Sequence, residues 1–258
     1  MTEKAALKTV KTAARTLDVF EAFCAAGEPL SITALAERIH SPVSSCHTLV
    51  KTLQARGYLY TLDQRRLIYP TKRMFELTRE ISRHDPLLRK IAPLMTALRD
   101  RTGETVVMGK RQGGEAVYLD VIEGTHTIRY SAQSGQTRQL YSSSIGKALL
   151  GLVSERDLDA YLARTKFRAW TRNTITDPEV LRENIAAGRA QGYYTTRGEN
   201  VDDVMAIAVS LRIAGEGLSF ALAGPAPRIE ANFDRYLAEV QAFARDLEAL
   251  NDSLSRTG

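Results

Sequence analysis

Hydrophobic residues in the first third of the chain recur every three or four positions, the spacing that places them on one face of a helix. Such a segment covers residues 13–26 and ends at Gly27, and a second one, about two turns long, covers residues 32–39. Ser41 followed by Pro42 is the order expected at the N-cap and first turn of a further helix, which runs to Ala55. The pattern therefore predicts three short helices before residue 56.

The third predicted helix has an apolar face and a polar face. The apolar face is expected to be buried and contains Val43, Cys46, Leu49, Val50 and Leu53. The polar face contains hydrogen-bonding side chains and one lysine: Ser44, Ser45, His47, Thr48 and Lys51. Such side chains suit base edges and phosphates in the major groove of DNA. The pattern alone also fits an ordinary solvated helix face.

A short basic hairpin is predicted directly after this helix. Residues 57–70 have the pattern of a strand, a turn at Asp63-Gln64 and a second strand, with Arg65 and Arg66 beside the turn. A helix pair, a recognition-type helix and a basic hairpin follow one another in a winged helix-turn-helix, whose hairpin can contact phosphates or the minor groove. Residues 10–71 are therefore predicted to form a DNA-binding domain.

The distribution of charge strengthens this prediction. Residues 1–84 contain 13 basic and 8 acidic side chains, whereas the remaining 174 residues contain 22 of each. A local excess of positive charge attracts a polyanion through counterion release, although an excess of this size also arises by chance. Double-stranded DNA is the polyanion that fits the predicted recognition helix.

The composition excludes several other classes of protein. No stretch approaches the roughly 18 uninterrupted apolar residues of a membrane span, and the charged opening residues do not resemble an export signal, so we expect a cytoplasmic protein without a membrane partner. Cys24 and Cys46 lie in apolar helical segments, which predicts reduced packing residues rather than a disulfide. The four histidines are scattered and no nucleotide-binding or zinc-protease motif occurs, so no metal and no cofactor are expected.

Two amphipathic helices are predicted after the hairpin. Residues 72–84 form a linker helix, and Asp85-Pro86 begins the next helix. The apolar face of the linker helix contains Met74, Leu77, Thr78 and Ile81. This face fits either pairing with a second copy of the chain or burial against the same chain. DNA geometry favours a dimer, with a tetramer as a further option, because one DNA-binding domain contacts only half of an operator.

The remainder of the chain, residues 85–255, has the pattern of a mixed domain of strands and helices. Strands are predicted at residues 104–110, 116–122, 127–131, 204–212 and 217–224, the last two joined as a hairpin. Helices are predicted at residues 146–153, 155–163, 177–192 and 229–254. An antiparallel sheet with helices on its outer faces belongs to the α+β class, so the chain is expected to be an α+β protein of two domains.

An anion-binding site is predicted near the start of the helix at residues 146–153. Ser142, Ser143 and Ser144 place three hydroxyls and backbone amides near a helix N-terminus, which suits a carboxylate. Arg129 and Arg138 are candidates for a bidentate clamp on such an anion. For each arginine the alternative is an exposed surface charge.

Ser144 and Lys147 also match the S-x-x-K pattern of penicillin-binding enzymes, in which a lysine lies one helical turn from the nucleophilic serine. The companion K-T-G and S-D-N motifs are absent, and a pattern with two fixed positions is common by chance. A serine hydrolase is therefore a minor alternative, beside a DNA-binding assembly protein that senses no ligand.

The sequence resembles the IclR family of bacterial regulators over nearly its whole length. In the first domain the resemblance is carried by TLDVFEAF, ITALAERI and PVSSCHTLVKTLQARGYLY, and in the second by SSSIGKALL, TITDPEVLRENIAAGRAQGY, VMAIAVSL and FALAGP. It implies a GAF-like second domain that binds an effector. The family commonly has a lysine where this chain has Val43 and an arginine where it has Thr48, which implies different base contacts here, with Lys51 compensating at a phosphate.

The resemblance also implies the lining of an effector pocket. The candidate residues are Arg129, Tyr130, Arg138, Ser142, Ser143, Ser144, Ile145, Thr196, Ala206, Ala221 and Ala223. Relatives often carry Asp, Cys or Ser at the last four positions, so alanines imply a larger, less polar cavity and an aromatic or otherwise hydrophobic carboxylate. The expected function is a ligand-responsive repressor or activator. Its expected partners are a double-stranded DNA operator, the organic acid, a second copy of the chain and, as a further candidate, RNA polymerase.

Overall fold

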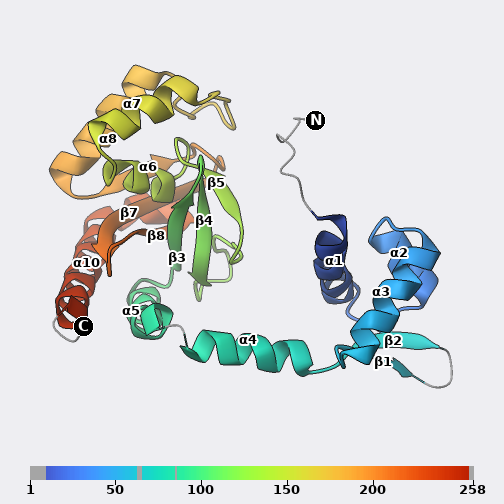
Figure 1. Ribbon diagram of the computed structural model, residues 1–258. Coiled ribbons are helices and arrows are strands. Elements are labelled where there is room, and N and C mark those ends of the chain that lie inside the picture. Colours follow the sequence, from blue (N-terminus) through green and yellow to red (C-terminus); the bar gives the residue numbers. More distant parts are fainter. Residues whose placement is uncertain (1–9, 63–65, 85, 256–258) are drawn as a thin grey trace. The chain divides into compact units, whose positions relative to one another are not determined.

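The computed structural model describes residues 10–62, 66–84 and 86–255 (Figure 1). The chain divides into two compact units between Pro86 and Leu87. The predicted turn at Asp63-Gln64, Arg65 and the predicted helix start at Asp85 lie outside the described residues. Each unit has a hydrophobic core of its own.

The first unit is a helical domain with a two-stranded hairpin. Its elements are α1 (Lys11–Ala26), α2 (Ile32–Arg38), α3 (Val43–Ala55), β1 (Leu59–Leu62), β2 (Leu67–Pro70) and α4 (Arg73–His84). The core combines Val19 of α1, Leu35 of α2, Val50 of α3 and Ile68 of β2, all nearly inaccessible to solvent. Ile68 also exchanges backbone hydrogen bonds with Leu30, which fixes the hairpin against the loop before α2. The predicted helix-turn-helix and its hairpin are confirmed.

The start of α3 differs from the prediction in two respects. Pro42 rather than Ser41 is the N-cap residue, and the hydroxyl of Ser41 makes no capping bond. Val43, expected on the buried face, is 49% exposed. Burial in α3 begins one turn later at Cys46, whose thiol contacts the carbonyl of Ile32 at the start of α2, so the first turn of α3 lies outside the core.

The helix α4 shows an unpartnered apolar face within the first unit. It has no buried residue, and on the predicted apolar face the exposed fractions of Leu77 and Ile81 are 40% and 71%. Its N-terminal end is anchored by the hydroxyl of Thr71, which donates to the Gly57 carbonyl at 2.6 Å, and by Arg73 over the ring of Tyr58. The face leaves a surface to which another chain could bind.

The second unit is a six-stranded antiparallel sheet with helices on both faces. Its strands are β3 (Thr105–Gln112), β4 (Glu115–Ile122), β5 (Thr137–Gln139), β6 (Tyr194–Arg197), β7 (Val204–Ile213) and β8 (Glu216–Pro225), in the spatial order β5-β4-β3-β8-β7-β6. Its helices are α5 (Pro86–Thr102), α6 (Ser144–Gly151), α7 (Glu155–Arg164), α8 (Pro178–Gln191), α9 (Ala226–Ala231) and α10 (Phe233–Ser255). The predicted α+β class with an antiparallel sheet is confirmed. Among the described residues, no helix combines the length and apolarity needed to cross a bilayer.

Alternation along the strands divides this unit into two cores. Val107 of β3 and Ala221 of β8 face the core that contains α6, α7 and α8. The neighbouring residues Val106 and Leu222 face the opposite core, which contains α5, α9 and α10. Successive side chains of a strand point to opposite faces, so one strand serves both cores. Figure 1 shows α6, α7 and α8 gathered on one side of the sheet.

The strand predicted at residues 127–131 is wrong. These residues lie in an irregular connection between β4 and β5. The carbonyl of Ile128 accepts from Arg228 and that of Tyr130 accepts from Thr105, so side chains take the place of a neighbouring strand. The prediction also missed the short strands β5 and β6, which lie at the two edges of the sheet. Strands of three and four residues give too short an alternation to detect.

Candidate DNA-binding and effector sites

The exposed face of α3 carries the residues predicted to read DNA. Ser44, Ser45, His47, Thr48 and Lys51 are all exposed. The hydroxyl of Thr48 donates to the carbonyl of Ser44 at 3.2 Å, so the oxygen of this hydroxyl remains able to accept a hydrogen bond. Arg66 is exposed at the end of the hairpin turn with φ of 51°, while Arg65 lies outside the described residues. This face therefore offers hydroxyls, an imidazole and a cation to a bound duplex.

A groove of about 680 Å³ lies beside α3 and adds residues that the sequence analysis missed. Ser45, Thr48, Thr52 and Arg56 line one side of it, and Arg15 of α1 lines another. These residues, three on α3 and Arg56 at its C-cap, are spaced by three or four positions, so the helical spacing in the sequence already pointed to Arg56. Arg15 could not be placed there from the sequence, because α1 reaches this groove only through tertiary packing.

A small cavity lies in the second unit between the sheet and α6. Its volume is about 40 Å³. It is lined by ten of the predicted effector residues, namely Tyr130, Arg138, Ser142, Ser143, Ser144, Ile145, Thr196, Ala206, Ala221 and Ala223. Val107, Tyr118, Asn200, Val201 and Val204 complete the lining. The fold thus brings together residues that are up to 116 positions apart in the sequence.

The start of α6 forms the polar wall of this cavity. Ser143 is the N-cap residue, and its hydroxyl oxygen accepts from the Gly146 amide at 3.1 Å while its proton goes to the Gln139 carbonyl. The hydroxyl of Ser142 accepts from the side-chain amide of Asn200 at 3.0 Å. The first amides of a helix have no partner within it, so this end attracts an anion.

Arg138 is the cation of the cavity. Its Nη1 donates to the Thr137 carbonyl at 3.1 Å, its Nη2 donates to the Tyr130 hydroxyl at 3.4 Å, and its guanidinium lies 5.6 Å from the ring centre of Tyr118. Its Nε is buried and has no hydrogen-bond partner in the part of the chain that the structure describes. Burial raises the pKa of Tyr118, and the adjacent Tyr130 raises it further, so Tyr118 presents a neutral phenol. The cavity therefore contains a partly unsatisfied positive charge between two aromatic rings.

Arg129 does not join Arg138. Its Nη2 lies 3.0 Å from a carboxylate oxygen of Glu123, and the Ser131 hydroxyl donates to the other oxygen at 2.6 Å. Hydrogen bonds from Ser131 and then Arg129 lower the pKa of Glu123, which keeps the surface pair charged. The predicted two-arginine clamp is thus reduced to Arg138, because a neighbouring carboxylate already engages Arg129.

The alanine positions do not make the cavity roomy. Ala206 and Ala223 are cross-strand partners on β7 and β8, and Ala221 lies on the same face. The side chains of Tyr118, Tyr130 and Arg138 occupy the space opposite them. The small volume therefore reflects filling by the arginine and the two phenols, a tertiary effect that the alanine pattern could not reveal.

A buried ion pair lies behind the serine wall and was not predicted. The Lys147 ammonium lies 2.7 Å from a carboxylate oxygen of Glu199, and the exposed fractions of the two side chains are 0% and 10%. The other oxygen of Glu199 is buried without a partner. Burial lowers the pKa of Lys147 and raises that of Glu199, each opposed by the attraction of the other charge. A lysine inside an apolar helix was the sequence signal that a buried partner exists.

This ion pair bears on both the cavity and the hydrolase alternative. Glu199 begins the segment that carries Asn200, Val201 and Val204 to the cavity, so the pair fixes that segment to α6. A general-base lysine would need its amine beside the Ser144 hydroxyl. Lys147 instead makes its hydrogen bond to Glu199.

Among the described residues, no three His, Cys, Asp or Glu side chains gather as metal ligands.

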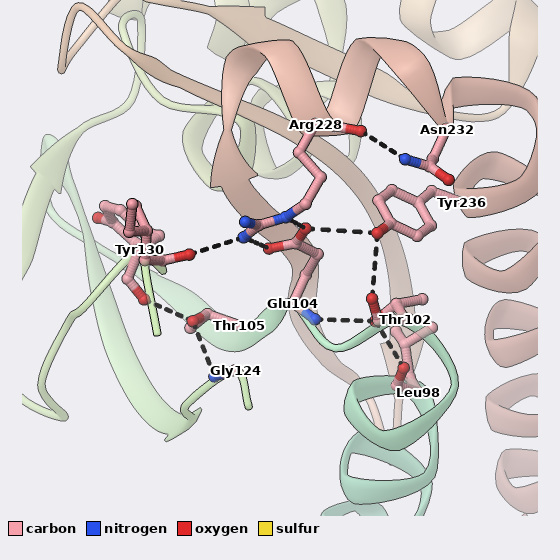
Figure 2. A network of polar contacts seen from close by, with 10 residues as sticks. Leu98, Thr102, Glu104, Thr105, Gly124, Tyr130, Arg228, Asn232 and Tyr236 are labelled. Carbon is pink, nitrogen blue, oxygen red and sulfur yellow. Dashed lines mark hydrogen bonds and ion pairs between the residues drawn. The ribbon is translucent and has the colours of Figure 1, made fainter. Parts of the chain in front are cut away.

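A second polar network holds the segment that carries Tyr130 (Figure 2). Glu104, fully buried at the start of β3, receives two hydrogen bonds from Arg228 of α9. Arg228 also donates to the Ile128 carbonyl at 2.9 Å. The Thr105 hydroxyl donates to the Tyr130 carbonyl at 2.5 Å and accepts from the Gly124 amide at 3.0 Å. The cavity wall at Tyr130 is therefore fastened to β3 and α9.

Two glycines make this close packing feasible. A Cβ on Gly124 would lie 2.6 Å from the Gly103 carbonyl oxygen, and one on Gly224 would lie 2.3 Å from the Glu104 carboxylate. Real Cβ atoms do not approach other atoms so closely. The Tyr236 hydroxyl donates to the Thr102 carbonyl at 3.1 Å, which connects the network to the end of α5 (Figure 2).

A winged helix-turn-helix with an exposed polar helix, together with a separate domain enclosing a small anion-attracting cavity, defines a ligand-sensing transcription regulator. Residues 12–63 match the IclR helix-turn-helix domain, and residues 79–249 match the bacterial transcriptional regulator IclR C-terminal domain. The chain belongs to the IclR family, as its resemblance predicted.

Known proteins of similar sequence and fold agree with this assignment. The HTH-type transcriptional regulator BhcR of Paracoccus denitrificans is 30% identical over 217 residues, which cover 83% of this chain and 77% of the relative. The IclR structure of Thermotoga maritima has a TM-score of 0.75 at 24% identity and covers 93% of this chain and 99% of its own. An IclR homologue from Microbacterium hydrocarbonoxydans, solved with 4-hydroxybenzoate, has a TM-score of 0.67 at 21% identity, covering 90% and 99%.

Proposed function

We propose that this chain is a transcription regulator whose operator affinity is modulated by a small aromatic or hydrophobic carboxylate bound beside Arg138. The observation that carries the proposal is the buried Nε of Arg138, which has no partner in a cavity bordered by the N-terminus of α6. A buried donor without a partner costs about 1–3 kcal/mol, and more when it is charged. A carboxylate would satisfy the guanidinium and the α6 amides together.

The aromatic character of the ligand is inferred from the other walls. Tyr118 and Tyr130 supply ring faces, and the alanines of β7 and β8 supply an apolar floor. A cavity of about 150 Å³ accepts benzene. The present 40 Å³ accepts a smaller group, so an aromatic ring requires the Arg138 side chain to leave the face of Tyr118. The 4-hydroxybenzoate bound to the Microbacterium homologue supports this class of ligand.

The DNA-binding half of the proposal rests on α3 and α4. Ser44, Ser45, His47 and Thr48 would read base edges, while Lys51 and the hairpin arginines Arg65 and Arg66 would contact phosphates. The exposed apolar face of α4 would pair with that of a second copy and so present two reading heads to a palindromic operator. Effector binding would change operator affinity by about 1–3 kcal/mol, the usual range of allosteric coupling.

Thermal-shift and operator-binding measurements test the proposal. Benzoate and 4-hydroxybenzoate are expected to raise the melting temperature and change operator affinity, whereas glyoxylate and pyruvate are expected to act weakly. Arg138→Ala should abolish the response, and Arg129→Ala is the matched control because its guanidinium already pairs with Glu123 outside the cavity. Stabilisation by the small polar acids alone would contradict the aromatic assignment. A failure of every acid in a broad panel would favour the assembly protein without a ligand.

A further inference from the structure

A second cavity of about 530 Å³ lies on the second unit, away from the effector site. It is formed by the turn between β3 and β4, by the strand β5 and by the end of α7. The helix α7 is yellow in Figure 1. None of its lining residues lines the effector cavity. A Cβ added to Gly113 or Gly114 would meet no atom within 4 Å, so the cavity is open beside the turn.

The lining of this cavity is positively charged. Arg111, Arg164 and Lys166 line it, and no acidic side chain does. In the described part of the chain, none of the three forms an ion pair. The Gln139 amide of the lining donates to one oxygen of Glu115 on the neighbouring strand at 2.8 Å. Three cations thus line one cavity, and none of them is paired with a carboxylate of the described residues.

The two guanidinium groups are held in place by the backbone. Arg111 donates through Nε to the Gly113 carbonyl at 3.0 Å, and Arg164 donates through Nε to the Ala160 carbonyl at 2.8 Å. For both residues the terminal nitrogens make no hydrogen bond within the described chain. A guanidinium fixed through Nε presents its fork in one orientation, which suits bidentate binding of an oxyanion.

A buried hydroxyl completes the lining. Tyr161 is 4% exposed, and its hydroxyl has no hydrogen-bond partner among the described residues. Burial raises the pKa of Tyr161 to about 12, with Arg111 opposing, so the phenol keeps its proton at neutral pH. The Thr165 hydroxyl donates to the Tyr161 carbonyl at 2.7 Å rather than to this hydroxyl. Tyr161 therefore adds an unpaired hydroxyl to the residues that line the cationic cavity.

We infer that this cavity binds the dianionic phosphate group of a small phosphorylated metabolite. Two fixed forks and one ammonium provide more donors than the two oxygens of a carboxylate can accept, whereas a phosphate monoester has three charged oxygens. The remaining volume accommodates the organic part of such an ester. The side-chain oxygen of Gln139 can accept a hydrogen bond from it, and so can the Thr165 hydroxyl, whose own proton goes to the Tyr161 carbonyl at 2.7 Å. The regulator would then have a second small-molecule input, separate from the acid site beside Arg138.

Isothermal titration of the full-length protein tests this inference. The probes are glycerol 3-phosphate and glucose 6-phosphate, with glycerol and glucose as neutral controls and inorganic phosphate and sulfate as ion controls. We expect the esters to bind with a Kd below about 1 mM at physiological salt. The double variant Arg164→Ala/Lys166→Ala should weaken binding at least tenfold, and Arg156→Ala, an arginine of the same helix outside the cavity, should not. Tyr161→Phe should weaken it about threefold through loss of one hydrogen bond.

Four outcomes would overturn the inference. No saturable binding of either ester up to about 10 mM would do so. Equal weak binding of phosphate and sulfate by the parent and the double variant would show an adventitious ion only. Loss of ester binding in Arg138→Ala with retention in the double variant would place the ester in the effector cavity. Loss of operator affinity in the double variant without any ester binding would make the cluster a nucleic-acid surface. Ester binding does not depend on an acid effector, so the two proposals succeed or fail separately.

Discussion

Replacement of Lys147 with methionine should destabilise the second unit severely. The substitution retains the length of the side chain but removes the ammonium that donates to the Glu199 carboxylate, whose other oxygen has no hydrogen-bond partner among the described residues. The Glu199 side chain is 10% exposed, so water cannot replace the ammonium. Breaking a buried pair by removing one charge costs about 3–5 kcal/mol. A loss of this size corresponds to a decrease in melting temperature of roughly 10 °C for a unit of this size.

Urea unfolding followed by tryptophan fluorescence measures this loss. Trp170 is the only tryptophan of the chain and lies in the second unit, where its indole donates to the Tyr141 hydroxyl at 3.1 Å. The fluorescence change therefore reports on the unit that contains the ion pair. Lys110→Met is the matched control, because Lys110 pairs with Glu216 at 2.6 Å while both side chains are about half exposed. An exposed pair of this kind contributes about 0–1 kcal/mol.

The double variant Lys147→Met/Glu199→Leu separates the loss of a contact from the burial of a lone charge. An apolar pair of similar size should recover most of the lost stability, since neither charge then remains in the interior. The reasoning is refuted if Lys147→Met costs no more than Lys110→Met. It is also refuted if the double variant is as unstable as the single one, because the cost would then come from packing.

Three further predictions concern titration, DNA contact and the cavity wall. Burial raises the pKa of Glu199 and lowers that of Lys147, so stability should fall as pH rises above the ordinary carboxyl range and rise again just below the ordinary lysine pKa. In the Glu199→Gln variant, the urea midpoint should no longer fall as pH rises above the ordinary carboxyl range. Lys51→Ala should weaken binding to operator and random DNA alike and reduce the salt slope by about one, whereas His47→Ala should alter sequence preference. Unchanged discrimination by His47→Ala in fluorescence anisotropy would contradict the assignment of α3. Thr105→Val removes the hydrogen bond to the Tyr130 carbonyl and should weaken effector binding about fivefold in calorimetry, corresponding to about 1 kcal/mol, with no change in operator affinity without effector.

Local patterns were sufficient for most of the elements. The helical periods predicted over residues 13–26, 32–39 and 177–192 each correspond to an observed helix, namely α1, α2 and α8. Asp177 accepts from two amides of α8, which is the capping bond that its position next to Pro178 indicates. These features depend on interactions within a few residues, so the order of residues is enough to predict them.

The effector cavity was predictable only in part. Ser142 to Ile145 are adjacent in sequence and their helix N-terminus is a local feature, so the polar wall could be found. The choice between Arg129 and Arg138 was not local. It depends on Glu123, which engages Arg129 at the surface and leaves Arg138 to enter the cavity. Both arginines have the same chemistry, and only their tertiary surroundings distinguish them.

The sequence by itself determined the two domains, the helix-turn-helix, the hairpin and the class of the sheet, because hydrophobic period and capping residues act over short distances. Only the tertiary structure decided that residues 127–131 are not a strand, that Lys147 meets Glu199 52 positions away, and that three cationic side chains line one cavity with Tyr161. In each case the chain had several polar groups that could serve as partners. The burial and packing of distant segments selected one of them, because a buried polar group must find a partner within reach.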